Sequence, residues 1–337
     1  MLYPHGWQIG KLVAGDHLSG YLVSGGDGGT FKLEEVPLLG MFRYHLGYGQ
    51  VARMSGKVSR GRSRLKLERL KEGELSFLKG GEGEPLVLLH GIPGSAYAWE
   101  ASGRQLAERY QVIIPDLLGF GRSDPPRGDY YISAQAVAIR ELLVYLGLKS
   151  LYLGGHDFGA PVALTLMRLF PELEVRGLVL SATNVFTDTH VPLPLRTARI
   201  PYLSTVFYKA MAGNRLGMRI MYLAATKHKS EVSWERFSQH LTPASIDLTR
   251  RIFQRSLADL RANYRAIENM LPTITSPTLV LWGANDPFFA ASVGERVHQT
   301  IPESRLKIYE DTGHFVPEEH PSRVAQDIMD FFGSIGS

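Results

Sequence analysis

Short apolar runs alternate with longer amphipathic stretches from Leu65 onward. Each run is rich in Val, Ile and Leu and ends in a turn containing Gly, Pro or Asp, and the stretches between them have apolar residues at helical spacing. This alternation predicts an α/β protein with a mostly parallel β-sheet and helices on both faces. The predicted strands are 86–89, 112–114, 151–153, 178–180, 278–282 and 306–309, and the predicted helices are 134–146, 161–170, 291–300 and 321–332.

The interval 184–270 interrupts this pattern. It is rich in Arg, Tyr, Met and Leu at helical spacing and contains no convincing buried strand. We therefore predict a core made of residues 65–183 and 271–337, with a helical cap of residues 184–270 inserted after one strand. Ligands of open α/β sheets bind outside the carboxyl ends of the strands, so the insertion is expected to cover that edge as a lid.

The first 64 residues have a different character from the rest. Residues 1–35 are Gly-rich and have no sustained period, which predicts a poorly packed arm. Residues 36–66 hold seven cations and no anion, and we expect a solvated tail there rather than a site for a membrane surface or an anionic partner. Because the remainder is close to neutral, the pI of about 9.1 does not predict a nucleic-acid partner.

Composition sets the broad class of the protein. A chain of 337 residues with 44% hydrophobic residues can bury a large core. It has no cysteine, which excludes disulfides, thiolate metal sites and a cysteine nucleophile. No secretion signal and no long apolar run is evident, so the expectation is a cytoplasmic protein without a transmembrane segment. The oligomeric state is left open, with a homodimer as one option.

Three residues suited to catalysis each follow a predicted strand. Asp157 follows strand 151–153, Asp286 follows strand 278–282, and His314 follows strand 306–309. Carboxyl ends of parallel strands converge on one crevice, so these side chains are expected to meet there. Their order along the chain, nucleophile, acid and histidine, is that of a hydrolase triad on such a sheet. Gly155 and Gly159 allow the tight turn that would expose Asp157.

Backbone N–H groups are expected beside Asp157. The turn HGIPG offers the N–H of Ile92, which together with that of Phe158 would form an oxyanion hole. The N-terminus of the helix that follows is expected to favour an ionised Asp157. A lone Asp after a strand is more often a helix cap, and a lone Gly-His pair more often a turn. Their joint occurrence in this order favours a catalytic site.

The same motifs resemble a known superfamily. They are HGIPG (90–94), DLLGFGRSD (116–124), GGHDFGA (154–160), WGANDP (282–287) and TGHF (312–315). The sequence from about Leu65 to the C-terminus resembles the α/β-hydrolase superfamily, and residues 1–60 lie outside the resemblance. With Asp in the nucleophile position, the chain is similar to the branch that contains epoxide hydrolases and haloalkane or fluoroacetate dehalogenases.

A carboxylate at this turn favours attack on an sp³ carbon. Serine attacking such a carbon would form an ether, which the enzyme could not release. Asp157 would instead form an alkyl ester, which His314, oriented by Asp286, could hydrolyse by activating water. The pattern therefore indicates an epoxide or an alkyl halide as substrate rather than an ester.

The resemblance separates these two substrate classes by their proton and halide donors. Epoxide hydrolases of this fold protonate the epoxide oxygen with two lid tyrosines. The run LRANYRAIENM is similar to the second tyrosine motif and implies Tyr264, and RIPYLSTVFYKAM offers Tyr202, which we favour, or Tyr208 for the first. Haloalkane dehalogenases usually carry donors where this chain has Phe158 and Ile92, whose side chains cannot donate.

The sequence thus predicts an epoxide hydrolase that converts a hydrophobic epoxide and water to a vicinal diol without metal or organic cofactor. The runner-up is a haloalkane dehalogenase with the same triad. A small-ligand receptor on the same fold is disfavoured by the intact triad, and esterase-like or cofactor-free oxygenase chemistry is left open. The residues predicted to line the pocket are His90, Pro93, His156, Phe186, Tyr208, Trp234 and Phe315.

Overall fold

The computed structural model of the chain divides into two compact units, Met1–Arg60 and Gly61–Ser337. The structure describes residues 8–14, 17–24, 30–33, 66–69, 75–125, 132–188, 215–239, 241–242, 245–248 and 263–335, with side chains from residue 75 onward.

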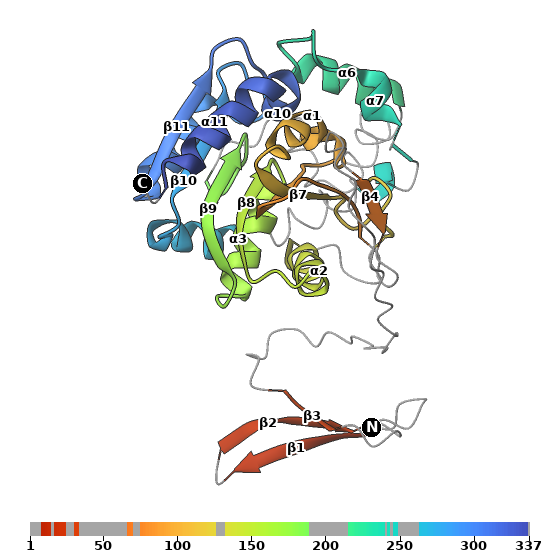
Figure 1. Cartoon of the computed structure of the whole chain (residues 1–337), viewed down its shortest axis with the longest axis vertical. Coiled ribbons are helices and arrows are strands. Elements are labelled where there is room, and N and C mark those ends of the chain that lie inside the picture. Colours follow the sequence, from red (N-terminus) through yellow and green to blue (C-terminus); the bar gives the residue numbers. More distant parts are fainter. Residues whose placement is uncertain are drawn as a thin grey trace. The chain divides into compact units, whose positions relative to one another are not determined.

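The first unit contains a small antiparallel sheet of three strands (Figure 1). The strands are β1 (Gln8–Ala14), β2 (His17–Ser24) and β3 (Thr30–Leu33). These strands were not predicted from the sequence, and the expectation of a poorly packed arm stays a prediction. Most of the glycines that suggested a loose chain lie between the strands, where Gly15-Asp16 and the run SGGDGG are turn signals, while Gly10 and Gly20 lie within β1 and β2. The strands also contain β-branched and aromatic residues such as Val13, Tyr21 and Phe31.

The second unit is built on an eight-stranded sheet with the order β11-β10-β9-β8-β6-β7-β5-β4 (Figure 1). Its strands are β4 (Lys66–Arg69), β5 (Ser76–Gly80), β6 (Glu84–Leu89), β7 (Tyr110–Pro115), β8 (Ser150–His156), β9 (Glu174–Ser181), β10 (Thr278–Gly283) and β11 (Ser304–Tyr309).

Strands β6 to β11 pair in parallel, and β4 and β5 form an antiparallel edge beside β7. The predicted mostly parallel sheet is confirmed, and each of the six predicted strands lies within one of these elements. The antiparallel edge was not predicted. All carboxyl ends of the parallel strands lie at one edge of the sheet, which is where the candidate side chains follow β8, β10 and β11.

Alternate residues of the strands pack on opposite faces of the sheet. In β6, Leu86 and Leu88 join one buried cluster, and Val87 and Leu89 join the other. This period of two is what a sheet covered on both sides requires. The first cluster includes α1 (Tyr97–Leu106) and α11 (Pro321–Gly333), and the second includes α2 (Ile132–Tyr145), α3 (Gly159–Leu169), α9 (Ala291–Thr300) and η2 (Leu271–Thr273).

The described part of the interval 184–270 contains helices and no strand. Helix α6 (Arg215–Ala225) and helix α7 (Trp234–Ser238) contact each other, and residues 263–270 are helical. Tyr222 and Phe237 stack with ring centroids 4.3 Å apart and form the centre of a separate apolar cluster. The helical content agrees with the sequence, and the role of this interval as a lid stays a prediction.

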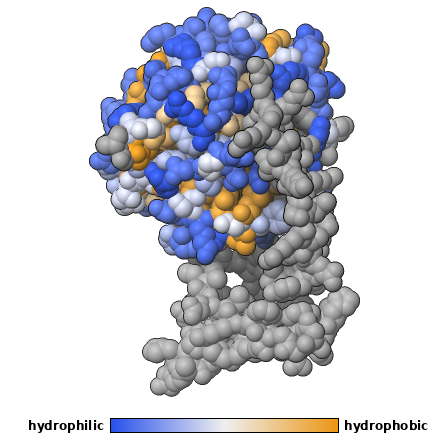
Figure 2. Space-filling view, in the orientation of Figure 1, coloured by the Kyte–Doolittle hydropathy of each residue, from blue (hydrophilic) through white to orange (hydrophobic). Residues whose placement is uncertain are grey.

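The surface that faces the viewer is largely hydrophilic, interrupted by smaller hydrophobic areas (Figure 2). Among the residues with described side chains, the exposed large hydrophobics are Val144, Tyr145, Leu169, Leu216 and Ile220. Scattered apolar residues of this kind are usual on a surface in contact with water. Within the described residues, no helix combines the length and the apolar character needed to span a bilayer.

Candidate active site

Asp157 occupies a strained turn between β8 and α3. Its φ is +50°, a conformation that residues with a side chain rarely adopt. The turn is tight because a Cβ on Gly155 would lie 2.5 Å from the backbone of Ala160, and one on Gly159 would lie 2.4 Å from the carbonyl oxygen of Leu89. Strain of this kind persists where surrounding structure over-determines it, and it lifts the Asp157 side chain out of the sheet edge.

Two backbone N–H groups act on the Asp157 carboxylate. The N–H of Ile92 donates to Oδ1 at 2.9 Å, and the N–H of Phe158 also stabilises the charge. Gly91 permits this approach, because a Cβ there would lie 2.4 Å from the Cβ of Asp157. The two donors predicted for an oxyanion hole therefore point at the carboxylate itself.

His314 connects the two aspartates. Its Nδ1 lies 2.9 Å from Asp286 Oδ2, and its Nε2 lies 3.7 Å from Asp157 Oδ2. The other oxygen of Asp286, Oδ1, accepts from the N–H groups of Phe288 at 2.8 Å and Phe289 at 3.1 Å, so this carboxylate is held in its orientation. Donation from Nδ1–H to Asp286 leaves the Nε2 lone pair directed toward Asp157. The three residues thus come together in the geometry of a triad.

Burial and neighbouring charges act against each other on the pKa of Asp157 and on that of His314, and both pKa values are raised. Burial raises the pKa of Asp157 above its usual range, even though His314 and the two N–H groups oppose the rise. The helix terminus therefore does not keep the pKa low, contrary to the expectation from sequence, because desolvation of the carboxylate outweighs it. Burial works against protonation of His314, yet the charges of Asp286 and Asp157 raise its pKa.

Tyr264 lies close enough to Asp157 for the charge of that carboxylate to raise the pKa of its hydroxyl. The tyrosine is half-buried in the helix at 263–270 and packs against the core. Burial and the Asp157 charge raise its pKa, so the phenol stays protonated and can donate a hydrogen bond. The other two tyrosines considered, Tyr202 and Tyr208, lie outside the described residues.

His90 and His156, both predicted to line the pocket, make hydrogen bonds to the backbone, and their place in a pocket stays a prediction. Nδ1 of His90 lies 2.7 Å from the Gly91 carbonyl oxygen, and its Nε2 accepts from the N–H of Leu117 at 2.9 Å. His156 Nε2 lies 3.0 Å from the carbonyl oxygen of His314, to which it donates. Burial lowers the pKa of His156 to about 3, so the ring is neutral. Both residues therefore fix neighbouring backbone.

The other described pocket candidates, Pro93, Phe186, Trp234 and Phe315, are largely apolar. Pro93 is buried after a cis peptide bond. Phe186 is buried, with the guanidinium of Arg296 3.8 Å from the centre of its ring. Phe315 lies beside His314, with ring centroids 5.2 Å apart, and contacts Tyr222. Trp234 joins the same apolar cluster through Tyr222, at 6.0 Å.

The sequence did not single out two aromatic neighbours of His314. The rings of Phe288 and Phe289 meet the imidazole edge-on, at centroid distances of 4.9 and 5.7 Å. Their N–H groups also hold Asp286, so the run WGANDPFF supplies the carboxylate, its two donors and an apolar wall in the four consecutive residues from Asp286 to Phe289. The pair of phenylalanines directly after Asp286 was the available signal.

Glu319 fixes the loop that carries His314. This fully buried carboxylate accepts from the N–H groups of Gly313 and Phe315 on either side of the histidine, and from those of Lys227 and His228 after α6. The N–H of His314 also donates to the Ala225 carbonyl oxygen at 2.8 Å. The histidine loop is therefore tied to the end of α6, which nothing in the sequence indicated.

Glu318, the neighbour of Glu319, is a buried acid that the sequence also missed. It belongs to helix α10 (Val316–Glu319), and its carboxylate accepts a hydrogen bond from the hydroxyl of Tyr222 at 2.7 Å. Burial raises the pKa of Glu318 to about 7, and the charge of Glu319 adds to the rise. At neutral pH this carboxyl is therefore close to half-ionised inside the protein.

Glu318→Gln is expected to become more stable relative to the wild type as pH rises. A carboxyl whose pKa rises from 4.5 in the unfolded chain to about 7 in the folded one binds more protons when folded, so wild-type stability falls between these values. The difference in unfolding free energy should move in favour of the variant by about 2 to 3 kcal/mol between pH 5 and pH 8. Urea unfolding at the two pH values measures it.

The matched control for this prediction is Glu303→Gln, which makes the same change of charge at an exposed position. Its stability difference from the wild type should be nearly independent of pH. An equal pH dependence in both variants would contradict the burial argument for Glu318.

The sequence profile of the alpha/beta hydrolase fold family matches residues 84–321. The chain therefore belongs to this family, and the resemblance noted in the sequence is confirmed. The matched range contains every residue of the triad geometry described above. The described side chains that could hold a metal ion, His228, Asp311 and His320, include none of them.

Relatives with two different activities are equally similar to the chain. Epoxide hydrolase 4 of Homo sapiens is 27% identical over 281 residues, covering 78% of this chain and 77% of the relative. Haloalkane dehalogenase 2 of Mycobacterium bovis is also 27% identical, over 274 residues, covering 77% and 92%. A solved haloalkane dehalogenase loop variant from Bradyrhizobium elkanii has a TM-score of 0.69 at 21% identity, covering 82% and 98%. The chain is a hydrolase of this family, and the choice between the two activities depends on the site.

Proposed function

We propose that the protein is an epoxide hydrolase that opens a hydrophobic epoxide to a vicinal diol. The observation that carries the proposal is the carboxylate of Asp157 at the strand-to-helix turn, with Oδ1 held by the N–H of Ile92 and Oδ2 facing His314 Nε2 at 3.7 Å. In this arrangement Oδ2 is the attacking atom. Oδ1 is already in the position where charge develops later.

The first step forms an ester between Asp157 and the substrate. Oδ2 attacks one epoxide carbon, the carbon–oxygen bond of the ring breaks, and the ring oxygen leaves as an alkoxide that remains attached to the other carbon. Tyr264 gives its phenolic proton to that oxygen, which yields a hydroxyl and a phenolate. The half-buried tyrosine near Asp157, protonated in the free enzyme, supports this role.

The second step releases the diol and restores the enzyme. Neutral His314 removes a proton from water, and the hydroxide attacks Cγ of Asp157. The N–H groups of Ile92 and Phe158 then stabilise the negative charge on Oδ1 in the tetrahedral intermediate. Collapse breaks the bond between Cγ and Oδ2, and the diol oxygen takes the proton from His314. The hydrolysed Asp157 carboxyl then loses its proton to solvent and the phenolate of Tyr264 regains one from solvent, so the net reaction consumes only the epoxide and one water. Asp286 stabilises the imidazolium that forms between these events.

The donors available at the site favour an epoxide over an alkyl halide. A halide ion needs N–H donors beside the carbon that is attacked, and the side chains of Ile92 and Phe158 provide none. The backbone N–H of Ile92 is already engaged by Asp157. An alkoxide is strongly basic and needs a proton, which Tyr264 can supply. The apolar rings of Phe288, Phe289 and Phe315 around His314 favour a hydrophobic substrate.

Tyr264→Phe is expected to lower the rate of epoxide opening by roughly 100-fold or more, the usual contribution of a positioned proton donor. The substitution removes only the hydroxyl, so the packing of the half-buried ring against the core should persist. The measurement is diol formation from a panel of aryl and alkyl epoxides, together with bromide release from short bromoalkanes. Tyr145→Phe, at an exposed tyrosine of α2, is the matched control and should behave as the wild type.

The proposal would be overturned if the wild-type protein released bromide but formed no diol, and if Tyr264→Phe still released bromide. That result would establish the haloalkane dehalogenase instead, the activity of a relative at the same identity. If Tyr264→Phe formed diol as fast as the wild type, the assignment of an epoxide substrate would stand, but Tyr264 would be excluded as the proton donor.

A further inference from the structure

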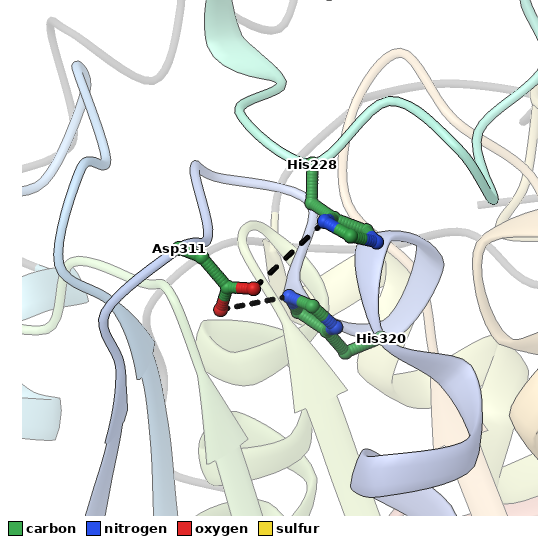
Figure 3. Close-up of side chains that lie close together, drawn as sticks. All are labelled: His228, Asp311 and His320. Atoms are coloured by element: carbon green, nitrogen blue, oxygen red, sulfur yellow. Dashed lines mark ion pairs between the residues drawn. The ribbon is translucent and has the colours of Figure 1, made fainter.

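Two histidines and an aspartate from distant parts of the chain converge beside the histidine loop. His228 follows α6, Asp311 follows β11, and His320 lies between α10 and α11. Figure 3 shows a nitrogen of each ring directed at a different oxygen of the same carboxylate. His228 Nδ1 lies 3.8 Å from Asp311 Oδ2, and His320 Nε2 lies 3.1 Å from Asp311 Oδ1. None of these residues takes part in the proposed reaction.

The spacing of these atoms suits one small cation. A tetrahedral zinc ion with bonds of about 2.0–2.2 Å to nitrogen and oxygen holds its ligand atoms roughly 3.4 Å apart. The two measured separations lie on either side of that value, and all three ligand atoms lie within 4.8 Å of one another. At least one of the two stacked rings would have to rotate for both nitrogen lone pairs to converge on the ion. Two imidazoles and a carboxylate form a donor set that Zn²⁺ binds well.

His320 supplies the observation that an ion pair alone does not explain. The residue is more than nine-tenths buried, and its Nε2 atom makes no hydrogen bond to any described residue, although it faces Asp311. A buried nitrogen that makes no hydrogen bond, even with a carboxylate oxygen 3.1 Å away, is costly, which points to a ligand that the protein atoms do not provide. A metal ion between Nε2 and the carboxylate would satisfy it.

The surroundings of His228 orient it for the same role. Its other nitrogen, Nε2, lies 2.7 Å from Ser230 Oγ, and donation to that oxygen leaves the Nδ1 lone pair directed at Asp311. The rings of His228 and His320 stack with centroids 4.4 Å apart, so both face the carboxylate from the same side. Arg323 also approaches Asp311, at 3.4 Å, with its guanidinium over the Tyr309 ring and its side chain about half exposed.

We propose that His228 Nδ1, His320 Nε2 and the Asp311 carboxylate bind a zinc ion, with water at the fourth position. Asp311 and His228 keep partly exposed side chains, which gives the ion and the water access from solvent. Asp311 precedes His314 by three residues, and His228 belongs to the segment that Glu319 ties to the same loop. The ion therefore acts as a clamp between the end of α6 and the loop that carries the histidine of the site. The clamp does not depend on which substrate the protein uses.

The test is metal binding by the full-length protein, purified without a histidine tag and stripped with a chelator. Titration with Co²⁺, followed by its visible absorption and by displacement with Zn²⁺, should give one bound ion per chain with tetrahedral character. His228→Ala and Asp311→Asn should each weaken binding by at least about 10–100-fold, the loss seen even for partners outside the ligand shell. His298→Gln removes a half-buried histidine that bonds Ser304 far from the cluster and should bind as the wild type does.

Two further measurements test whether bound zinc stabilises the residues around the cluster. Zn²⁺ should raise the melting temperature of the wild type and of His298→Gln, but not of Asp311→Asn. It should also slow amide exchange in residues 226–230 and 311–314. Ca²⁺, which requires oxygen ligands, should do neither. Absence of saturable binding at one ion per chain, or equal binding by the wild type and both cluster variants, would overturn the proposal.

Discussion

His314→Gln is expected to stop turnover and to leave the substrate attached to Asp157 as an ester. Attack by Asp157 Oδ2 does not need the imidazole, whereas hydrolysis of the ester needs a base close to the Asp157 carboxyl. His314 Nε2, which lies 3.7 Å from Asp157 Oδ2, is that base. The steady-state rate should fall by roughly 10⁴-fold or more, the usual effect of removing a triad histidine.

Intact-protein mass spectrometry after brief exposure to styrene oxide, and separately to 1-bromobutane, measures the trapped ester. An epoxide adds its whole mass, because the ring oxygen stays on the product, and a bromoalkane adds only the alkyl group with release of bromide. Peptide mapping should place the adduct on Asp157. The double variant Asp157→Asn with His314→Gln controls for alkylation elsewhere and should carry no adduct.

Each outcome of the trapping experiment assigns the chemistry. A whole-epoxide adduct on Asp157 supports the proposed function, and a butyl adduct supports the dehalogenase. An equal adduct in the double variant would show that the reactive group is a different residue, and the proposed role of Asp157 would then be wrong.

Asp157→Asn is expected to abolish turnover, by roughly 10⁴-fold or more, without unfolding the protein. Asparagine has the shape of aspartate and tolerates the φ of +50° at this turn, but its amide is not a nucleophile. Because burial raises the pKa of Asp157, its ionised form opposes folding above that pKa. The melting temperature of the variant at pH 8 should therefore be at least that of the wild type.

Turnover and melting temperature are measured on the same preparation, with intact mass to check that the amide has not reverted to the acid. Asp188→Asn, which makes the same substitution at an exposed aspartate paired with Arg296, is the matched control and should keep full activity. Full activity in Asp157→Asn with the amide intact would rule out the covalent mechanism.

Local patterns in the sequence were enough to predict the sheet of the second unit. The runs at 86–89, 151–153 and 278–282 are apolar apart from Thr278, because both faces of a parallel sheet are covered, and this signal does not depend on distant residues. The turns after them were predicted for the same reason. Gly155 and Gly159 are required by contacts within a few residues of Asp157 or with the adjacent strand.

Other elements were missed because their signals are weak or conflicting. The edge strands β4 and β5 are short, and α1 begins among small residues that also suit a loop. In the first unit, the high glycine content led us to expect no strands, despite the strand-forming residues between the turns. Pairing between strands decides whether such segments form a sheet, and that pairing is not visible in the sequence.

The sequence by itself determined which reactive side chains follow the carboxyl ends of the strands. Asp157, Asp286 and His314 follow β8, β10 and β11, and the parallel topology brings any residues in those positions to one edge. The type of the first residue, a carboxylate in place of a hydroxyl, is a property of composition that needs no coordinates to interpret.

Only the tertiary structure decided how these groups behave. The raised pKa of Asp157, the four N–H groups gathered by Glu319 and the convergence of His228 with His320 all arise between residues that are far apart in the chain or buried by distant elements. Desolvation and the meeting of side chains depend on packing in three dimensions, and packing is not encoded in the spacing of residues along a single segment.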